Sequence, residues 1–137
     1  MSIDKELTRL GLTLPAPANP AGSYKPCIIA DNTAYISGQG PLLDDGTFAK
    51  GVVGKDLDLE TAQMHAQRCG LAILSALKAE IGDLNRVQQL IKITGFVNCT
   101  NDFIKQPLVI NGCSDLMKEV FGAVSYTHLR AHETYDH

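Results

Sequence analysis

Three of the four histidines of the chain lie in its last thirteen residues, which read SYTHLRAHETYDH. His128 and His132 are four positions apart, and Glu133 follows the second of them. On a helix this spacing places two imidazoles on one face, an arrangement that is common in zinc sites. Because no partner ligand elsewhere in the sequence supports such a site, we predict that the protein binds no metal.

The same segment has a second interpretation. Residues 124–134, which read VSYTHLRAHET, match the translation of a common transposase-based sequencing adapter at eleven consecutive positions. Engineered sequence of this kind has to be excluded before the fold is considered. We therefore expect a domain at residues 1–123 that is incomplete at its C-terminus, followed by a non-native tail at residues 124–137.

The stretch SGQG at residues 37–40 is the most unusual local motif. Its two glycines can bring backbone N–H groups close to an anion, as backbone nests do. The structural alternative is a strand end that turns into a loop. The four cysteines form no CxxC pair, so we expect small buried thiols in place of a metal or redox centre.

The composition is that of one soluble globular domain. The chain has 137 residues, of which 45% are hydrophobic and 20% charged, and its net charge is -3. This balance gives no basic surface for nucleic acid and no polybasic patch for a membrane. The apolar runs are too short to span a bilayer, and the first residues lack the apolar stretch of a signal peptide, so we expect a cytoplasmic protein.

The first half of the chain predicts a short helix and a hairpin. Ser2 can cap a helix over residues 3–10, which Gly11 ends. Within residues 25–42 we predict two strands joined at the turn residues Asp31 and Asn32.

The second half predicts two amphipathic helices around a strand. A long helix over residues 59–81 has Asp58 as its N-cap and Gly82 as its C-cap. Arg68 is among the residues of its polar side.

A strand covers residues 90–97, where Ile93 and Val97 share one face and Phe96 lies on the other. A second helix covers residues 105–121. The expected fold is α+β, with both helices on one face of a mixed sheet. Such a sheet needs one or two further strands after the second helix, and we expect the tail to have replaced them, so that the final strands are missing.

Three stretches resemble the RidA family (reactive intermediate deaminase, YjgF-like, once called L-PSP endoribonuclease). They are AGSYKPCIIADNTAYISGQGPL, AILSALKAEIGDLNRVQQLIKITGFVNCTNDF and INGCSDLMKEVFG, which keep the family's order over about residues 11–123. The resemblance implies a chorismate-mutase-like fold assembled as a homotrimer, with ligand clefts between subunits. It also implies hydrolysis of reactive 2-imino and enamino acids to 2-oxo acids and ammonia, with no metal and no cofactor.

The resemblance also implies several substrate-binding residues. Tyr24 matches the family's cleft tyrosine, and Gly38 with Gln39 matches the loop whose backbone meets the substrate carboxylate. The family's asparagine on the second helix corresponds either to Asn111, by residue type, or to Ser114, by spacing. The family's substrate-gripping arginine and its water-positioning glutamate have no match before the tail.

The catalytic residues are therefore unknown, and we expect the intact parent protein to be active and this chain to be inactive. Two other functions remain open. A non-catalytic trimer can bind small metabolites in the same clefts, and the family's older name suggests a ribonuclease. The acidic balance and the aromatic content of 6% argue against nucleic acid as a partner and favour a small-molecule substrate.

Overall fold

The computed structural model describes residues 2–17 and 25–122, and the backbone of residues 129–135. The elements in chain order are α1 (Ile3–Arg9), β1 (Cys27–Ala30), β2 (Thr33–Ile36), α2 (Leu59–Ile81), the 3-10 helix η1 (Leu84–Arg86), β3 (Ile93–Cys99), α3 (Gln106–Phe121) and β4 (Leu129–Tyr135). These elements confirm an α+β fold. Tyr24 lies outside the described residues.

The long helix α2 begins and ends where the sequence predicts. The carboxylate of Asp58 accepts a hydrogen bond from the backbone N–H of Thr61 at 2.8 Å, which satisfies a donor that the first turn leaves open. At the other end Gly82 has a φ of 83°, and its N–H donates to the carbonyl of Lys78 at 2.8 Å. Both caps are local, so they could be predicted from the sequence.

Strands β1 and β2 form the predicted antiparallel hairpin. Asp31 and Asn32 have φ values of 49° and 63°, the left-handed conformation that a two-residue hairpin turn requires at both positions. Asp and Asn tolerate this conformation better than other residues with a side chain. The hairpin therefore needs no glycine, and Cys27 pairs with Ile36 at its open end.

The N-terminal helix α1 forms, but Ser2 does not cap it. The Ser2 side chain makes no capping hydrogen bond, so that prediction is wrong. The backbone N–H of Ile3 instead donates to Oδ1 of Asn85 in η1 at 3.0 Å. A side chain far along the chain thus satisfies one of the free donors at the start of α1.

Strand β4 corrects the expectation that no strand follows α3. Its residues 129–135 pair in parallel with β3 along its whole length, from Ile93 opposite Leu129 to Cys99 opposite Tyr135. Strand pairing uses backbone donors and acceptors, so an open edge of β3 can pair with a segment whatever its side chains are. The described residues contain two separate two-stranded sheets, β1–β2 and β3–β4, where we expected one mixed sheet.

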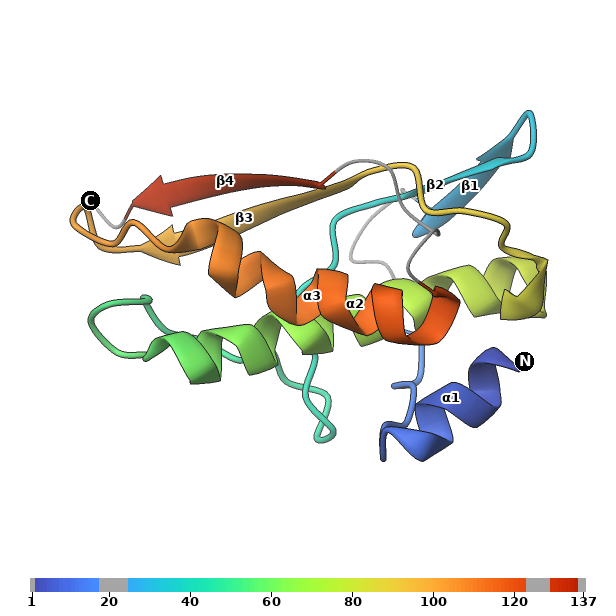
Figure 1. The fold of residues 1–137 in the computed structure, drawn as a ribbon, viewed down its shortest axis with the longest axis horizontal. Coiled ribbons are helices and arrows are strands. Elements are labelled where there is room, and N and C mark those ends of the chain that lie inside the picture. Colours follow the sequence, from blue (N-terminus) through green and yellow to red (C-terminus); the bar gives the residue numbers. More distant parts are fainter. Residues whose placement is uncertain (1, 18–24, 123–128, 136–137) are drawn as a thin grey trace.

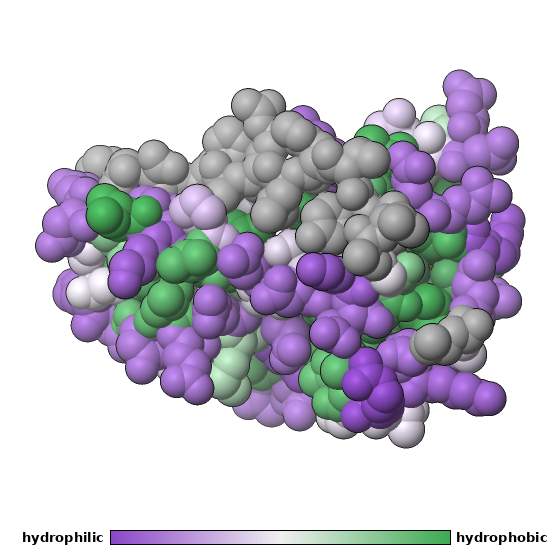
Figure 2. All heavy atoms as spheres, viewed as in Figure 1, coloured by the Kyte–Doolittle hydropathy of each residue, from purple (hydrophilic) through white to green (hydrophobic). Residues whose placement is uncertain are grey.

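The helices and strands form layers, with α2 and α3 together on one side of β3 and β4 (Figure 1). Ile93 and Val97 on β3 are buried toward the core, whereas Phe96 is 70% exposed, so the predicted alternation of β3 is confirmed. Leu71, Leu74, Leu116 and Met117 are the largest side chains at the centre of the core. On the face seen in Figure 2, hydrophilic residues surround smaller apolar areas wherever the surface is not grey.

Candidate functional site

The SGQG loop follows directly from β2. The backbone N–H and the hydroxyl of Ser37 both donate to the carbonyl of Pro26, at 2.9 and 3.2 Å. Because Pro26 precedes β1, these bonds extend the hairpin by one step and fix where the loop begins. The hairpin therefore positions residues 38–40 at its open end.

Beyond Ser37, three successive backbone N–H groups have no acceptor in the described part of the chain. The N–H groups of Gly38, Gln39 and Gly40 donate to no other residue that the structure describes. Gly38 is exposed, and no heavy atom of a described residue lies within 4 Å of the place where its Cβ would stand. Consecutive free N–H groups are a suitable partner for a carboxylate. The structure thus leaves room for an anion at the position the sequence analysis selected.

Side chains hold the far side of this loop. The ring of Phe48 lies 2.9 Å from the place where a Cβ of Gly40 would stand, so a side chain at residue 40 would force the ring to move. Arg68 on α2 donates from Nε to the carbonyl of Leu42 at 2.7 Å and from Nη2 to Oδ1 of Asp44 at 3.0 Å. These contacts fix residues 40–44 against α2.

Sequence reasoning missed Arg68. It was expected only as one of the polar residues on the outer side of α2, and its side chain is in fact 20% exposed. Its partners are 24 and 26 positions away in the sequence, so no local pattern reveals them. The role of Arg68 becomes visible only in the folded structure, where Leu42 and Asp44 lie against α2.

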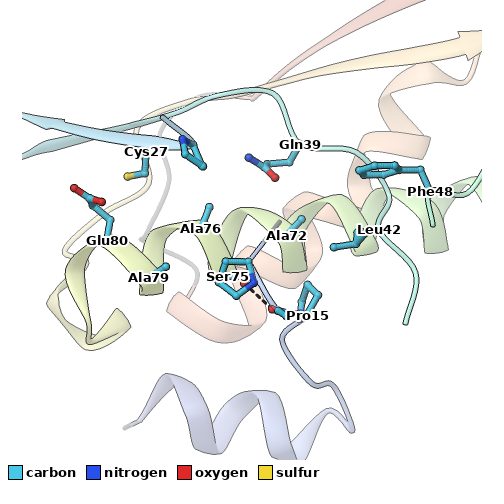
Figure 3. Close-up of a pocket in the computed structure, with 13 residues that line it drawn as sticks. Pro15, Cys27, Gln39, Leu42, Phe48, Ala72, Ser75, Ala76, Ala79 and Glu80 are labelled. Carbon is cyan, nitrogen blue, oxygen red and sulfur yellow. Dashed lines mark hydrogen bonds between the residues drawn. The ribbon is translucent and has the colours of Figure 1, made fainter. Parts of the chain in front are cut away.

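The side chain of Gln39 turns away from the free N–H groups. Its Nε2 donates to the carbonyl of Ser37 at 3.3 Å, and the amide lines a cavity of about 140 Å³ above α2 (Figure 3). The backbone N–H of Gln39 therefore belongs to the loop at residues 38–40, whereas its side-chain amide lines the cavity.

The remaining predicted site residues lie on α3. Ser114 is buried at 2% exposure among core side chains, and Asn111 is half-buried. Within the described chain β2 contacts α2 and does not contact α3. One subunit therefore does not bring β2 and α3 into contact, and the roles of Gly38, Gln39, Asn111 and Ser114 in ligand binding stay predictions.

Three of the four cysteine thiols have raised pKa values. Burial raises the pKa of the Cys69 thiol to about 11. Burial and the neighbouring Cys69 together raise the pKa of Cys113 to about 12. Burial also raises the pKa of Cys27. Thiols of this kind stay protonated at neutral pH and react slowly.

The described parts of the chain give no metal centre. They contain no group of three or more His, Cys, Asp or Glu side chains that could hold an ion. His128 and His137, and the side chains of His132 and Glu133, are outside the described part of the chain, so the candidate zinc site is not tested. No helix in the described segments is long and apolar enough to cross a membrane.

Two helices packed on one side of the strands, with an open loop after the hairpin, define a chorismate-mutase-like α+β protein. The chain belongs to the family described as "YjgF/chorismate_mutase-like, putative endoribonuclease", which matches residues 4–134. This confirms the YjgF-like (RidA) family expected from the sequence.

Known proteins of similar sequence or structure agree with this membership. "Protein TCP17" of Trypanosoma cruzi is 39% identical over 124 residues, which cover 90% of this chain and 78% of that protein. The crystal structure of Atu1372 from Agrobacterium tumefaciens, a protein of unknown function, has a TM-score of 0.84 and 40% identity, covering 98% of this chain and 82% of its own. A putative endoribonuclease from Shewanella oneidensis has a TM-score of 0.90 and 28% identity, covering 96% of this chain and 88% of its own.

Proposed function

We propose that the intact protein is a cytoplasmic hydrolase that converts reactive 2-imino and enamino acids into 2-oxo acids and ammonia without a cofactor. The observation that carries this proposal is the loop at residues 38–40, whose three N–H groups have no partner among the described residues. A substrate carboxylate would accept hydrogen bonds from them. This use of the loop is what the RidA resemblance implies.

The reaction needs only a water molecule as co-reactant. The imine carbon C2 gains a bond to the water oxygen, and the C–N bond then breaks. The nitrogen leaves as ammonia, and the oxygen remains as the 2-oxo group. Holding the carboxylate fixes C2 relative to the water, which lowers the entropic part of the barrier. The residue that activates the water is unassigned, because the family's arginine and glutamate have no match outside the adapter-like tail.

The same proposal includes a homotrimer with clefts between subunits. Ile28 and Tyr35 face each other across the hairpin and are 53% and 62% exposed. Phe96 on β3 is also largely exposed. Large apolar side chains at such exposure favour burial against another protein surface. A neighbouring subunit would also bring an α3 helix to β2, which makes no contact with α3 in the described part of one chain.

The test exchanges the C-terminal segment before activity is measured. Residues 124–137 are replaced by the corresponding segment of the Agrobacterium tumefaciens protein, which is 40% identical to this chain. We expect the chimera to release ammonia from a freshly generated 2-imino acid faster than buffer does, and the unaltered chain not to. A properly folded, trimeric chimera without any acceleration would remove the enzyme proposal.

The two alternatives give different outcomes with the same chimera. A non-catalytic binding protein would bind 2-oxo acids in calorimetry and leave the imine decay unchanged. A ribonuclease would cleave single-stranded RNA, and the cleavage would persist in a Gly38→Ala variant that loses imine binding. The net charge of -3 argues against the ribonuclease.

A further inference from the structure

The cavity above α2 has an apolar floor of small side chains. Ala72, Ala76 and Ala79 lie on the side of α2 that faces it, and their methyl groups leave the space open (Figure 3). The wall beside Ser75 includes Pro15, whose carbonyl accepts a 2.6 Å hydrogen bond from the hydroxyl of Ser75 (Figure 3). This bond ties the N-terminal segment to α2 and holds the wall in place.

The dimensions suit a small organic molecule. The cavity measures about 140 Å³. A cavity of about 150 Å³ with apolar walls is large enough for benzene. The lining residues of α2 run from Ala72 to Glu80, over which the helix advances about 12 Å. The cavity therefore suits an extended chain of about six carbon atoms better than a bulky ring system.

The two ends of the cavity differ in polarity. Leu42 and Phe48 lie at one end, and Cys27 and Glu80 lie at the other, with the amide of Gln39 between them (Figure 3). Glu80 is the one charged side chain among the described lining residues. It forms no ion pair with another described residue.

The Glu80 side chain is exposed at the end of the cavity that Cys27 also lines. After burial, this carboxylate is the second cause that raises the pKa of the Cys27 thiol. Its negative charge therefore reaches the lining, and it would repel the carboxylate of a 2-oxo or 2-imino acid. A protonated amine would be attracted to the same end and could also donate a hydrogen bond to Oε1 of Gln39.

We propose that this cavity binds a small primary alkylamine, with its ammonium group at Glu80 and its hydrocarbon chain along Ala76 and Ala72 toward Phe48. This site lies within one subunit and takes a cation, so it is independent of the proposed hydrolysis of an anionic substrate. Its contact with Gln39 links it to the loop at residues 38–40, because the side chain in the cavity and the free N–H belong to the same residue.

The experiment titrates the full 137-residue chain with three probes of equal carbon number. Hexylamine, hexan-1-ol and hexanoate are compared by isothermal titration calorimetry at pH 7.5. We expect hexylamine to bind, hexan-1-ol to bind more weakly, and hexanoate to give no saturable heat. Equal binding of the three probes, or no binding of hexylamine, would overturn the proposal.

Variants separate the charge from the shape of the cavity. Glu80→Gln should weaken hexylamine binding roughly fivefold, the effect of losing one partly exposed ion pair. Glu60→Gln, a matched change at an exposed position of the same helix, should leave it unchanged. Ala79→Leu should abolish binding by filling the space, with circular dichroism confirming the fold. Equal affinities of the Glu80 and Glu60 variants would contradict the proposed orientation, and unchanged binding by the Ala79 variant would contradict the location.

Discussion

Gly112 on α3 lies directly against the backbone carbonyl of Gln63 on α2, so that a Cβ atom at residue 112 would overlap the carbonyl oxygen. The amide of Gln63 adds a hydrogen bond from Nε2 to the carbonyl of Leu108 at 2.8 Å. The two helices thus approach each other at a point where only glycine fits, and backbone atoms cannot move aside as a flexible side chain can. This contact therefore sets the distance between α2 and α3.

Gly112→Ala should therefore destabilise the protein by about 2 kcal/mol, the usual cost of forcing an extra carbon into a packed core. Urea denaturation followed by circular dichroism measures the change. Asp115→Ala, at an exposed position of the same helix, is the control and should shift the free energy of unfolding by less than about 0.5 kcal/mol. If Gly112→Ala lowers the free energy of unfolding no more than Asp115→Ala does, α2 and α3 can move apart without loss of stability.

Gly38→Ala should separate binding from stability. The place of the new methyl group has no neighbour within 4 Å among the described residues, so thermal unfolding of the chimera should not change. The methyl group would occupy the space that we assign to the substrate carboxylate, and KM for a 2-imino acid should rise roughly tenfold. A variant with unaltered KM would place the substrate elsewhere.

Arg68 should act as a positioning residue for the loop. Arg68→Ala removes the bonds to Leu42 and Asp44, which should cost about 1 kcal/mol of stability and speed amide hydrogen exchange in residues 40–44. Arg68→Lys keeps the charge without the planar two-pronged geometry and should give an intermediate exchange rate. Gln67→Ala, at the neighbouring position of α2, should leave the exchange of the loop unchanged. An exchange rate that is the same in all variants would remove Arg68 from this role.

The Asp58 cap should make stability depend on acid pH. Hydrogen bonds from Thr61, first from its side chain and then from its backbone, lower the pKa of this carboxyl below its ordinary value of 3.8. A group whose pKa is lower in the folded state contributes its full stabilisation above the unfolded pKa and loses it as the pH falls through the folded pKa. Asp58→Asn should therefore flatten the pH dependence of the melting temperature below about pH 4. Thr61→Val should give an intermediate slope, and a slope equal to that of the unaltered protein in both variants would rule out this coupling.

Local signals made much of this fold predictable. The caps of α2 at Asp58 and Gly82 and the turn at Asp31 and Asn32 depend on residues adjacent in sequence, and all of them are confirmed. The contacts that fix residues 40–44 instead join residues that are far apart in the sequence. Arg68 reaches Leu42 from another element, so its role depends on packing that no periodic pattern encodes.

The sheet also could not be predicted fully from the sequence. Strand β4 forms at residues where the side-chain pattern gave no reason to expect a strand. If backbone pairing holds β4, proline should disrupt it, whatever the origin of this segment. Ala131 pairs opposite Gly95 and His132 opposite Phe96. Successive N–H groups of a strand point in opposite directions, so one of these two positions aims its N–H at β3.

Ala131→Pro and His132→Pro should accordingly differ, and the more harmful of the two should cost about 2 kcal/mol, for a lost ladder bond and a restricted backbone. Ala131→Ser and His132→Ser keep the N–H and serve as controls with little expected change. The free energy of unfolding in urea compares all four variants. If neither proline variant is less stable than its serine control, β4 does not contribute to the folded state, and residues 124–137 can be exchanged for the segment of the Agrobacterium tumefaciens protein without loss of stability.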